Sequence, residues 1–157
     1  MTVQYDCNIR ADGKNFRYRA AAIIIENGKV LLIKSKFGDY YYSVGGGVHI
    51  GETAEEAVRR EVYEETGVKY EVDRLAFVHE NFFIEDSDPG CPYHHEVAFY
   101  YLMKPCGQKY PVNSETDAGE KLCWLPIERL GEYKAYPEFL KDKLPLKDGI
   151  EHIVTDE

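Results

Sequence analysis

Short runs of β-branched and aromatic residues alternate with turn sequences along most of the chain. The pattern predicts strands over Val3–Arg10 and Phe16–Ile25, joined by a hairpin turn at Asp12-Gly13. A second hairpin is expected around Asn27-Gly28. Further strands are expected over residues 29–36, 40–44, 68–84, 94–103 and 121–126. Prolines open two expected short helices, residues 126–133 and 137–143, and residues 149–157 are interpreted as a strand or a tail.

The pattern changes to a helical period in the middle of the chain. Thr53 is the expected N-cap, with Glu56 three residues on completing a capping box. Gly67 stands where a left-handed residue would end the helix after Thr66. At about 100° per residue, one apolar stripe runs along this helix and must face the sheet. The stripe consists of Ala54, Ala57, Val58 and Val62.

The acidic residues of this helix divide between two faces. Glu61 and Glu65 fall within the apolar stripe and Glu64 lies at its edge, whereas Glu55 and Glu56 lie on the other side. An i,i+4 pair of like charges destabilises a helix by about 0.2–0.5 kcal/mol, and burial adds desolvation. A bound cation would turn this repulsion into ligation, and three carboxylates suit Mg²⁺ or Mn²⁺. Periodicity alone leaves the alternative open that the register differs and the acids are solvated.

Length, composition and charge limit the kind of domain and the kind of partner that this chain can have. The chain has 157 residues, 44% of them hydrophobic and 30% charged, with a formal net charge of −9. These values fit one globular domain over residues 1–157. The many expected strands with one strong helix in the middle predict a mixed α+β architecture. The negative charge argues against a nucleic-acid polymer as partner, because neutralising phosphates requires a basic surface. A small anionic substrate bound together with a divalent cation remains compatible with this charge.

Three further features of the sequence indicate the compartment in which the protein is found. The N-terminal segment lacks the basic-then-apolar order of a signal peptide. The longest apolar run, Ala20–Ile25, is too short to span a bilayer. The four cysteines show no CxxC spacing, which favours free thiols in a reducing compartment. We therefore expect a cytoplasmic protein without a membrane partner.

A glycine triplet, Gly45-Gly46-Gly47, precedes the acidic helix and allows a ligand to approach the backbone closely. Together the two segments form a family signature. Gly46, five residues, Glu52, seven residues and then Arg60–Val68 resemble the Nudix box, here residues 46–68, with every fixed position filled. The resemblance implies a Nudix-type α/β/α sandwich, in which the box forms a loop–helix–loop over a mixed β-sheet.

The resemblance also implies an activity and a set of site residues. Nudix (MutT-like) enzymes are pyrophosphatases that hydrolyse a nucleoside diphosphate linked to another moiety, with Mg²⁺ or alternatively Mn²⁺ as cofactor. The implied metal ligands are Glu61, Glu64, Glu65 and the carbonyl group of Gly45. Arg60 would orient Glu61 through a charge-assisted hydrogen bond, so that the implied catalytic residues are Arg60, Glu61 and Glu64. Gly46 and Glu52 would support the loop.

The general base and the substrate stay open. The base is either Glu61 or a glutamate outside the box, for which the candidates are Glu96, Glu115 and Glu120. The proline of many ADP-ribose hydrolases and the tyrosine of dinucleoside polyphosphate hydrolases are both missing beyond the box, where Phe82-Phe83-Ile84 stands instead. The expected partner is therefore a small nucleotide-type substrate of unspecified identity, and a homodimer is left open.

Two readings compete with a hydrolase. A catalytically silent Nudix-like domain that senses a nucleotide would usually have lost box glutamates, and this chain keeps them all. An isoprenoid diphosphate isomerase would need a catalytic cysteine, and no cysteine of this chain lies in that motif. The sequence therefore favours the hydrolase.

Overall fold

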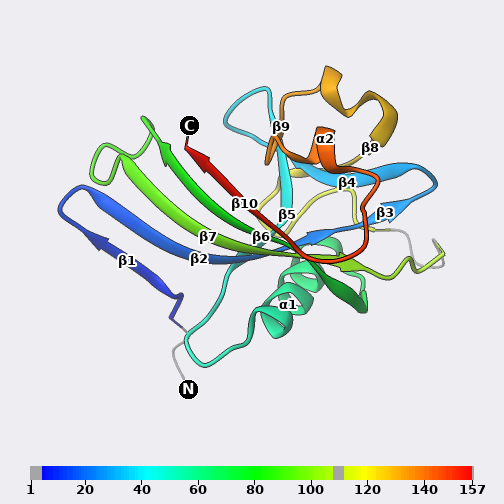
Figure 1. Ribbon diagram of the computed structural model, residues 1–157, viewed down its shortest axis with the longest axis horizontal. Coiled ribbons are helices and arrows are strands. Elements are labelled where there is room, and N and C mark those ends of the chain that lie inside the picture. Colours follow the sequence, from blue (N-terminus) through cyan, green and yellow to red (C-terminus); the bar gives the residue numbers. More distant parts are fainter. Residues whose placement is uncertain (1–4, 108–111, 157) are drawn as a thin grey trace.

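The structure is a computed structural model that describes residues 5–107 and 112–156. Within these residues ten strands form one mixed sheet in the order β10-β6-β7-β2-β5-β4-β3, with β1 beside β2, β8 beside β4 and β9 beside β5 (Figure 1). The strands are β1 Asn8–Ala11, β2 Lys14–Ile23, β3 Ile25–Glu26, β4 Lys29–Lys34, β5 Tyr41–Gly47, β6 Val72–Ile84, β7 Tyr93–Met103, β8 Lys121–Pro126, β9 Ala135–Tyr136 and β10 Glu151–Asp156. The helices are α1 Ala54–Thr66, a 3₁₀ segment η1 Ile127–Glu132, and α2 Leu140–Lys143.

The sheet is apolar on both faces because helical elements cover parts of each. Along β2, the side chains of Ala20 and Ala22 join a cluster with the buried stripe of α1. Ala21 and Ile23 point the other way and join a cluster with Leu130, Leu140 and other residues of the η1–α2 segment. This alternation gives a layer of α1, a mixed sheet and a layer of short helices, which confirms the expected α+β sandwich.

Local signals place helix α1 as predicted. The N–H of Glu56 donates to the Thr53 side chain at 3.1 Å, and Gly67 ends the helix with φ 76°. All four residues of the predicted apolar stripe are buried. The capping residues therefore fix both ends of the helix, and its apolar stripe fixes its rotation against the sheet.

Several boundaries differ from the sequence prediction. The first strand begins at Asn8, because Asp6 forms only an isolated bridge with His49, and the predicted start at Val3 lies outside the described residues. The strand expected over residues 40–44 continues through Gly47 by pairing with β2. The helix expected from residue 137 is shorter and begins at Leu140. The C-terminal segment is a strand, because residues 151–156 pair in parallel with β6.

In residues 5–107 and 112–156, no helix is long and apolar enough to cross a bilayer.

The N-cap gives a first testable prediction. Replacing Thr53 by Ala leaves the N–H of Glu56 without its acceptor and should lower the free energy of unfolding by about 1 kcal/mol. Urea unfolding followed by circular dichroism measures this change. Thr53→Ser retains the hydroxyl and should stay close to the parent protein. Equal losses in both variants would contradict a role for the cap.

Candidate active site

The acidic face of α1 packs directly on the glycine triplet of β5. A Cβ atom at Gly46 would lie 2.5 Å from the carboxyl group of Glu61, and one at Gly45 would lie 2.3 Å from the carbonyl oxygen of Ala20. Both distances are far below a permitted contact. The glycines lie within a strand, not in a turn, and they leave room for a carboxylate between helix and sheet.

The two faces of α1 differ as the periodicity predicts. Glu61 and Glu65 are partly buried against the sheet, whereas Glu55 and Glu56 are exposed and Glu64 is at the exposed edge. Since the register is the one expected, the alternative of fully solvated acids does not apply to Glu61 and Glu65.

Arg60 connects three segments of the box. Its Nε and Nη2 donate to the two carboxylate oxygens of Glu52 at 2.8 and 2.9 Å, and Nη1 donates to Glu61 at 2.8 Å. Nη2 also donates to the carbonyl of Gly47 at 3.1 Å, and a weaker contact of 3.4 Å reaches Glu64. The hydrogen bond from Arg60 lowers the pKa of Glu52. The expectation that Arg60 orients Glu61 agrees with these contacts.

Glu65 lies in a different environment. It accepts a hydrogen bond from the backbone N–H of Gly45 at 3.3 Å. Burial raises the pKa of Glu65 to about 8, and the positive charge of Arg19 offsets this only in part. Burial also raises the pKa of Glu61, against the effect of its bond to Arg60. The face thus carries two carboxyl groups whose ionisation is less favourable than it would be in water.

This donor set fits a divalent cation by its chemistry. Buried carboxylates with raised pKa values gain most from a cation that replaces their lost hydration. In residues 5–107 and 112–156, however, no three acidic, histidine or cysteine side chains stand together as a metal site. Glu61 is engaged by Arg60, and Gly45 presents its N–H to Glu65, whereas the sequence prediction used its carbonyl group. Binding a metal would therefore require rotation of these glutamate side chains.

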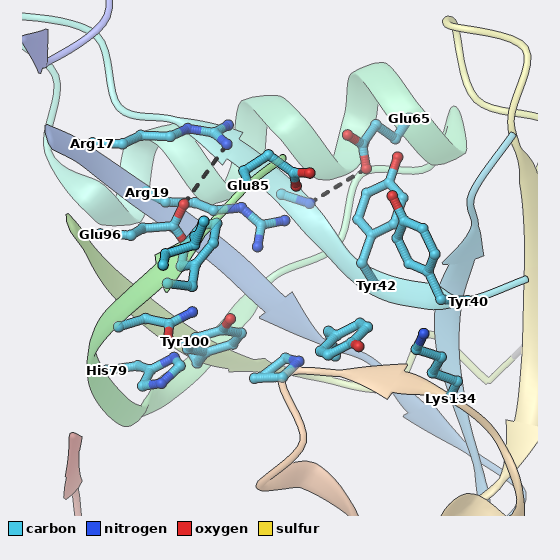
Figure 2. Close-up of a pocket in the computed structure, with 16 residues that line it drawn as sticks. Arg17, Arg19, Tyr40, Tyr42, Glu65, His79, Glu85, Glu96, Tyr100 and Lys134 are labelled. Atoms are coloured by element: carbon cyan, nitrogen blue, oxygen red, sulfur yellow. Dashed lines mark hydrogen bonds and ion pairs between the residues drawn. The ribbon is translucent and has the colours of Figure 1, made fainter. Parts of the chain in front are cut away.

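A cavity of about 660 Å³ adjoins this face (Figure 2). Gly45 and Glu65 form part of its wall, so the box helix reaches the cavity through Glu65. The rest of the wall comes from β2, β5, β6, β7 and the segment around β9, and it is mainly aromatic and charged. These residues are Arg17, Arg19, Tyr40, Tyr42, His79, Asn81, Phe83, Ile84, Glu85, Glu96, Tyr100, Lys134, Tyr136 and Pro137.

Two arginines of β2 give the cavity a positive wall. Arg19 donates to the side chain and the carbonyl of Ser43 at 3.2 and 2.8 Å. In the described ranges no carboxylate oxygen lies within 4.0 Å of Arg19, and the nearest for Arg17 belongs to Glu96 at 3.8 Å. Figure 2 shows Arg19 between Arg17 at one end and Tyr42 at the other. Arg19 therefore has no close carboxylate partner in these ranges, although Glu65, Glu85 and Glu96 also line the cavity.

The glutamates proposed outside the box separate in the structure. Glu96 lines the cavity on β7. Glu120 lies behind Tyr42, whose hydroxyl donates to it at 2.5 Å. Burial raises the pKa of the Tyr42 phenol, and Glu120 raises it further. Glu115 is exposed, pairs with Lys121 through an isolated backbone β-bridge, and is not among the residues that line the cavity.

Sequence reasoning missed Arg17, Arg19 and Glu85. The arginines carry a signal, because they alternate with Tyr18 in a strand whose continuation is apolar. Two cations on one face of such a strand indicate an anionic ligand. Glu85 gives no comparable signal, since it stands in an acidic loop sequence.

Comparison with known proteins agrees with this geometry. Residues 16–146 match the model of the NUDIX domain family. A MutT-like protein of Streptomyces ambofaciens is 32% identical over 116 residues, which are 74% of this chain and 67% of the relative. An ADP-ribose pyrophosphatase of Methanocaldococcus jannaschii is 34% identical over 130 residues, 81% and 72% of the two chains. The crystal structure of a MutT protein from Methanosarcina mazei Go1 superposes with a TM-score of 0.63 at 22% identity, over 84% of this chain and 92% of the other.

The chain belongs to the Nudix family, whose model covers most of its length. It is a Nudix pyrophosphohydrolase, an enzyme that cleaves acid anhydride bonds. Enzymes of this family generally use divalent metal ions and act on small nucleotide substrates.

The buried carboxyl of Glu65 gives a prediction about stability without metal. Its pKa of about 8 in the folded chain exceeds the ordinary value of 4.5, so the folded state holds this proton more tightly. This tighter binding of the proton stabilises the folded state fully below pH 4.5, and the stabilisation is lost as pH rises toward 8. Glu65→Gln should therefore be more stable than the parent protein at pH 8, by about 1 kcal/mol or more, with a smaller difference at pH 5.

The measurement is urea unfolding in EDTA at both pH values. The exposed Glu55→Gln is a matched control and should show no such dependence on pH. A Glu65→Gln variant less stable than the parent protein at pH 8 would contradict the burial of an unpaired carboxylate.

Proposed function

We propose that this enzyme hydrolyses the pyrophosphate bond of a nucleoside diphosphate linked to another moiety, with Mg²⁺ as cofactor and Mn²⁺ as an alternative. One observation carries the proposal: Glu65 of the box helix and the arginines Arg17 and Arg19 border the same cavity. A carboxylate suited to a cation thus faces guanidinium groups suited to phosphate oxygens, as a metal-bound diphosphate requires.

Glutamates of the box would bind the metal, and Arg60 of the box would keep them in position. Glu61, Glu64 and Glu65 supply carboxylate oxygens, and the backbone of Gly45 lies beside Glu65. A divalent cation bound there would neutralise the diphosphate and lower the pKa of a water molecule. Arg60 holds Glu61 against the strand, while its bidentate contact with Glu52 fixes the preceding loop.

The wall opposite the helix would bind the phosphates. Arg19 is fixed by its two hydrogen bonds to Ser43, so its guanidinium is oriented before the substrate arrives. Arg17 is only loosely paired with Glu96, at 3.8 Å. A phosphate on Arg17 would release Glu96, which lines the cavity and can then accept a proton from water. Glu96 is therefore our choice of general base outside the box.

The aromatic end of the cavity would hold the nucleoside. Tyr40, Tyr42 and Tyr136 line it, and the rings of Tyr40 and Tyr136 meet edge to face at 5.8 Å. Aromatic side chains provide a stacking surface for a base without selecting one base strongly. The archaeal relative is called an ADP-ribose pyrophosphatase, which makes ADP-ribose the first compound to test, although the proline typical of many such enzymes is missing.

The reaction itself can be tested directly. With Mg²⁺, ADP-ribose, a dinucleoside polyphosphate and a nucleoside triphosphate should be compared, and release of the nucleoside monophosphate followed for each. We expect hydrolysis of at least one compound, complete loss of it in EDTA, and recovery on adding Mg²⁺ or Mn²⁺. Full turnover after removal of metal would contradict the mechanism, and binding without hydrolysis would favour a nucleotide sensor.

The two acidic faces of α1 permit a matched comparison. Glu61→Gln with Glu64→Gln should raise the Mg²⁺ concentration for half-maximal activity at least about tenfold and lower the rate, with little loss of folding. Glu55→Gln with Glu56→Gln removes the same charge from the exposed face. It should cost about 1 kcal/mol or less of stability and leave the Mg²⁺ response unchanged.

Activity is titrated with Mg²⁺, and thermal unfolding is followed with and without the ion. Metal should raise the melting temperature of the exposed-face variant as it does that of the parent protein, because it binds only the folded site. An equal loss of metal response in both variants would show that the negative charge acts diffusely.

A further inference from the structure

One half of the sheet face that α1 packs on has no helix over it in the described part of the chain. In Figure 1 the ends of β2, β6 and β7 extend well beyond α1, together with the neighbouring strands β1 and β10. Side chains alternate between the two faces, and Tyr18 and Phe99 belong to the cluster with α1. Counting by twos from these residues places Phe16 on β2 and His95 on β7 on the same open face.

This open face is mainly apolar, apart from the ion pair of Glu80 with His152, and is formed by five adjacent strands. Four of its side chains are more than half exposed: Ile9 66%, Ile84 60%, Tyr93 59% and Val154 58%. Between them lies a hollow of about 510 Å³ whose wall includes Phe16, Phe82 and His95. Their rings contact one another, since His95 stacks on Phe82 at 4.4 Å and meets Phe16 edge to face at 5.2 Å. We call Ile9, Phe16, Phe82, Ile84, Tyr93, His95 and Val154 the open-face patch.

Contiguous exposed apolar surface on a folded protein usually marks an interaction surface. The polar border of the patch indicates which partner fits. Lys14 stands on β2 at one side and Asp156 on β10 at the other, with β6 and β7 between them. Both are exposed, and no ion pair involves either of them among the described residues. The patch thus has an unpaired positive side chain, Lys14, at one side and an unpaired negative side chain, Asp156, at the other.

This arrangement is complementary to itself. A second copy, turned about a two-fold axis that runs along the strands between β6 and β7, brings its β10 over β2 of the first. Lys14 of each copy then meets Asp156 of the other, and both contacts form at once. Ile84 of each copy then faces Tyr93 of the other, because these two residues pair across β6 and β7. A partner with one uniform charge would match only one side of the patch.

We propose that the chain forms a two-fold homodimer in which the open-face patches of two copies pack against each other. The proposal does not rest on the pyrophosphate chemistry, because no residue of the patch belongs to the box, and only Ile84 of the patch also lines the larger cavity. It also names the surface for the homodimer that the sequence left open.

The test measures mass by sedimentation equilibrium at about 1 to 100 µM protein and about 0.15 M salt. We expect the parent protein to be dimeric at the upper end of this range. Ile84→Glu should raise the dissociation constant at least about tenfold, because it places a charge in the apolar contact. Tyr93→Lys is a second variant with the same expected result. Phe37→Glu is the matched control and should leave the dimer unchanged. Phe37 is 82% exposed in the turn after β4 and lines neither the patch nor its hollow.

A charge exchange tests the orientation. Lys14→Glu and Asp156→Lys should each weaken the dimer, because each creates like-charge contacts at both symmetric positions. The double variant re-forms both pairs with reversed sense and should recover most of the affinity. A parent protein that is monomeric throughout the range, or a dimer unaffected by Ile84→Glu, would overturn the proposal. Failure of the double variant to recover affinity would overturn the two-fold arrangement.

Discussion

The site depends on the close approach of helix α1 to strand β5. The helix carries Glu61 to within contact of a strand that has no side chain at Gly46, and any Cβ there would meet the carboxyl group. The glycine triplet therefore matters because it has no side chains. It leaves a space between the carboxylates of α1 and the backbone of β5. Without that space the carboxylates would have to turn toward solvent, and the apolar stripe of α1 could not stay on the sheet.

Arg60 stabilises this close approach of α1 to β5. A guanidinium with five donors can hold Glu52 in two contacts and still reach Glu61 and the carbonyl of Gly47. Loop, helix and strand are thereby tied at one point. Glu65 lies outside this network, and burial leaves its carboxyl with a raised pKa. The fold thus stabilises one partly buried acid internally, and the next is the acid for which we propose neutralisation by a divalent cation.

The features of the site that the sequence predicted correctly depend on residues close together in the chain. The caps at Thr53 and Gly67 and the inward direction of Glu61 follow from residues within a few turns of one helix. The strand position of the glycine triplet did not follow, because it depends on pairing with residues 19–22 of a distant strand. For the same reason Arg19 was missed, although its alternation within β2 was visible. The sequence specifies the acidic face in one segment, but the opposing positive wall exists only after the strands have assembled.

In the outer part of the sheet, the ends of β6 and β7 contribute side chains to both faces. Phe83 and Ile84 border both the cavity beside α1 and the hollow of the open-face patch, because the chain there separates the two faces. On the cavity side this segment continues into Glu85, beside the arginines that would bind phosphate. On the other side it ends in apolar groups that water surrounds in a single copy. Packing a second copy on that outer face would restrict the strand end that also forms one wall of the cavity. Association and substrate binding would then act on one structural element from its two sides.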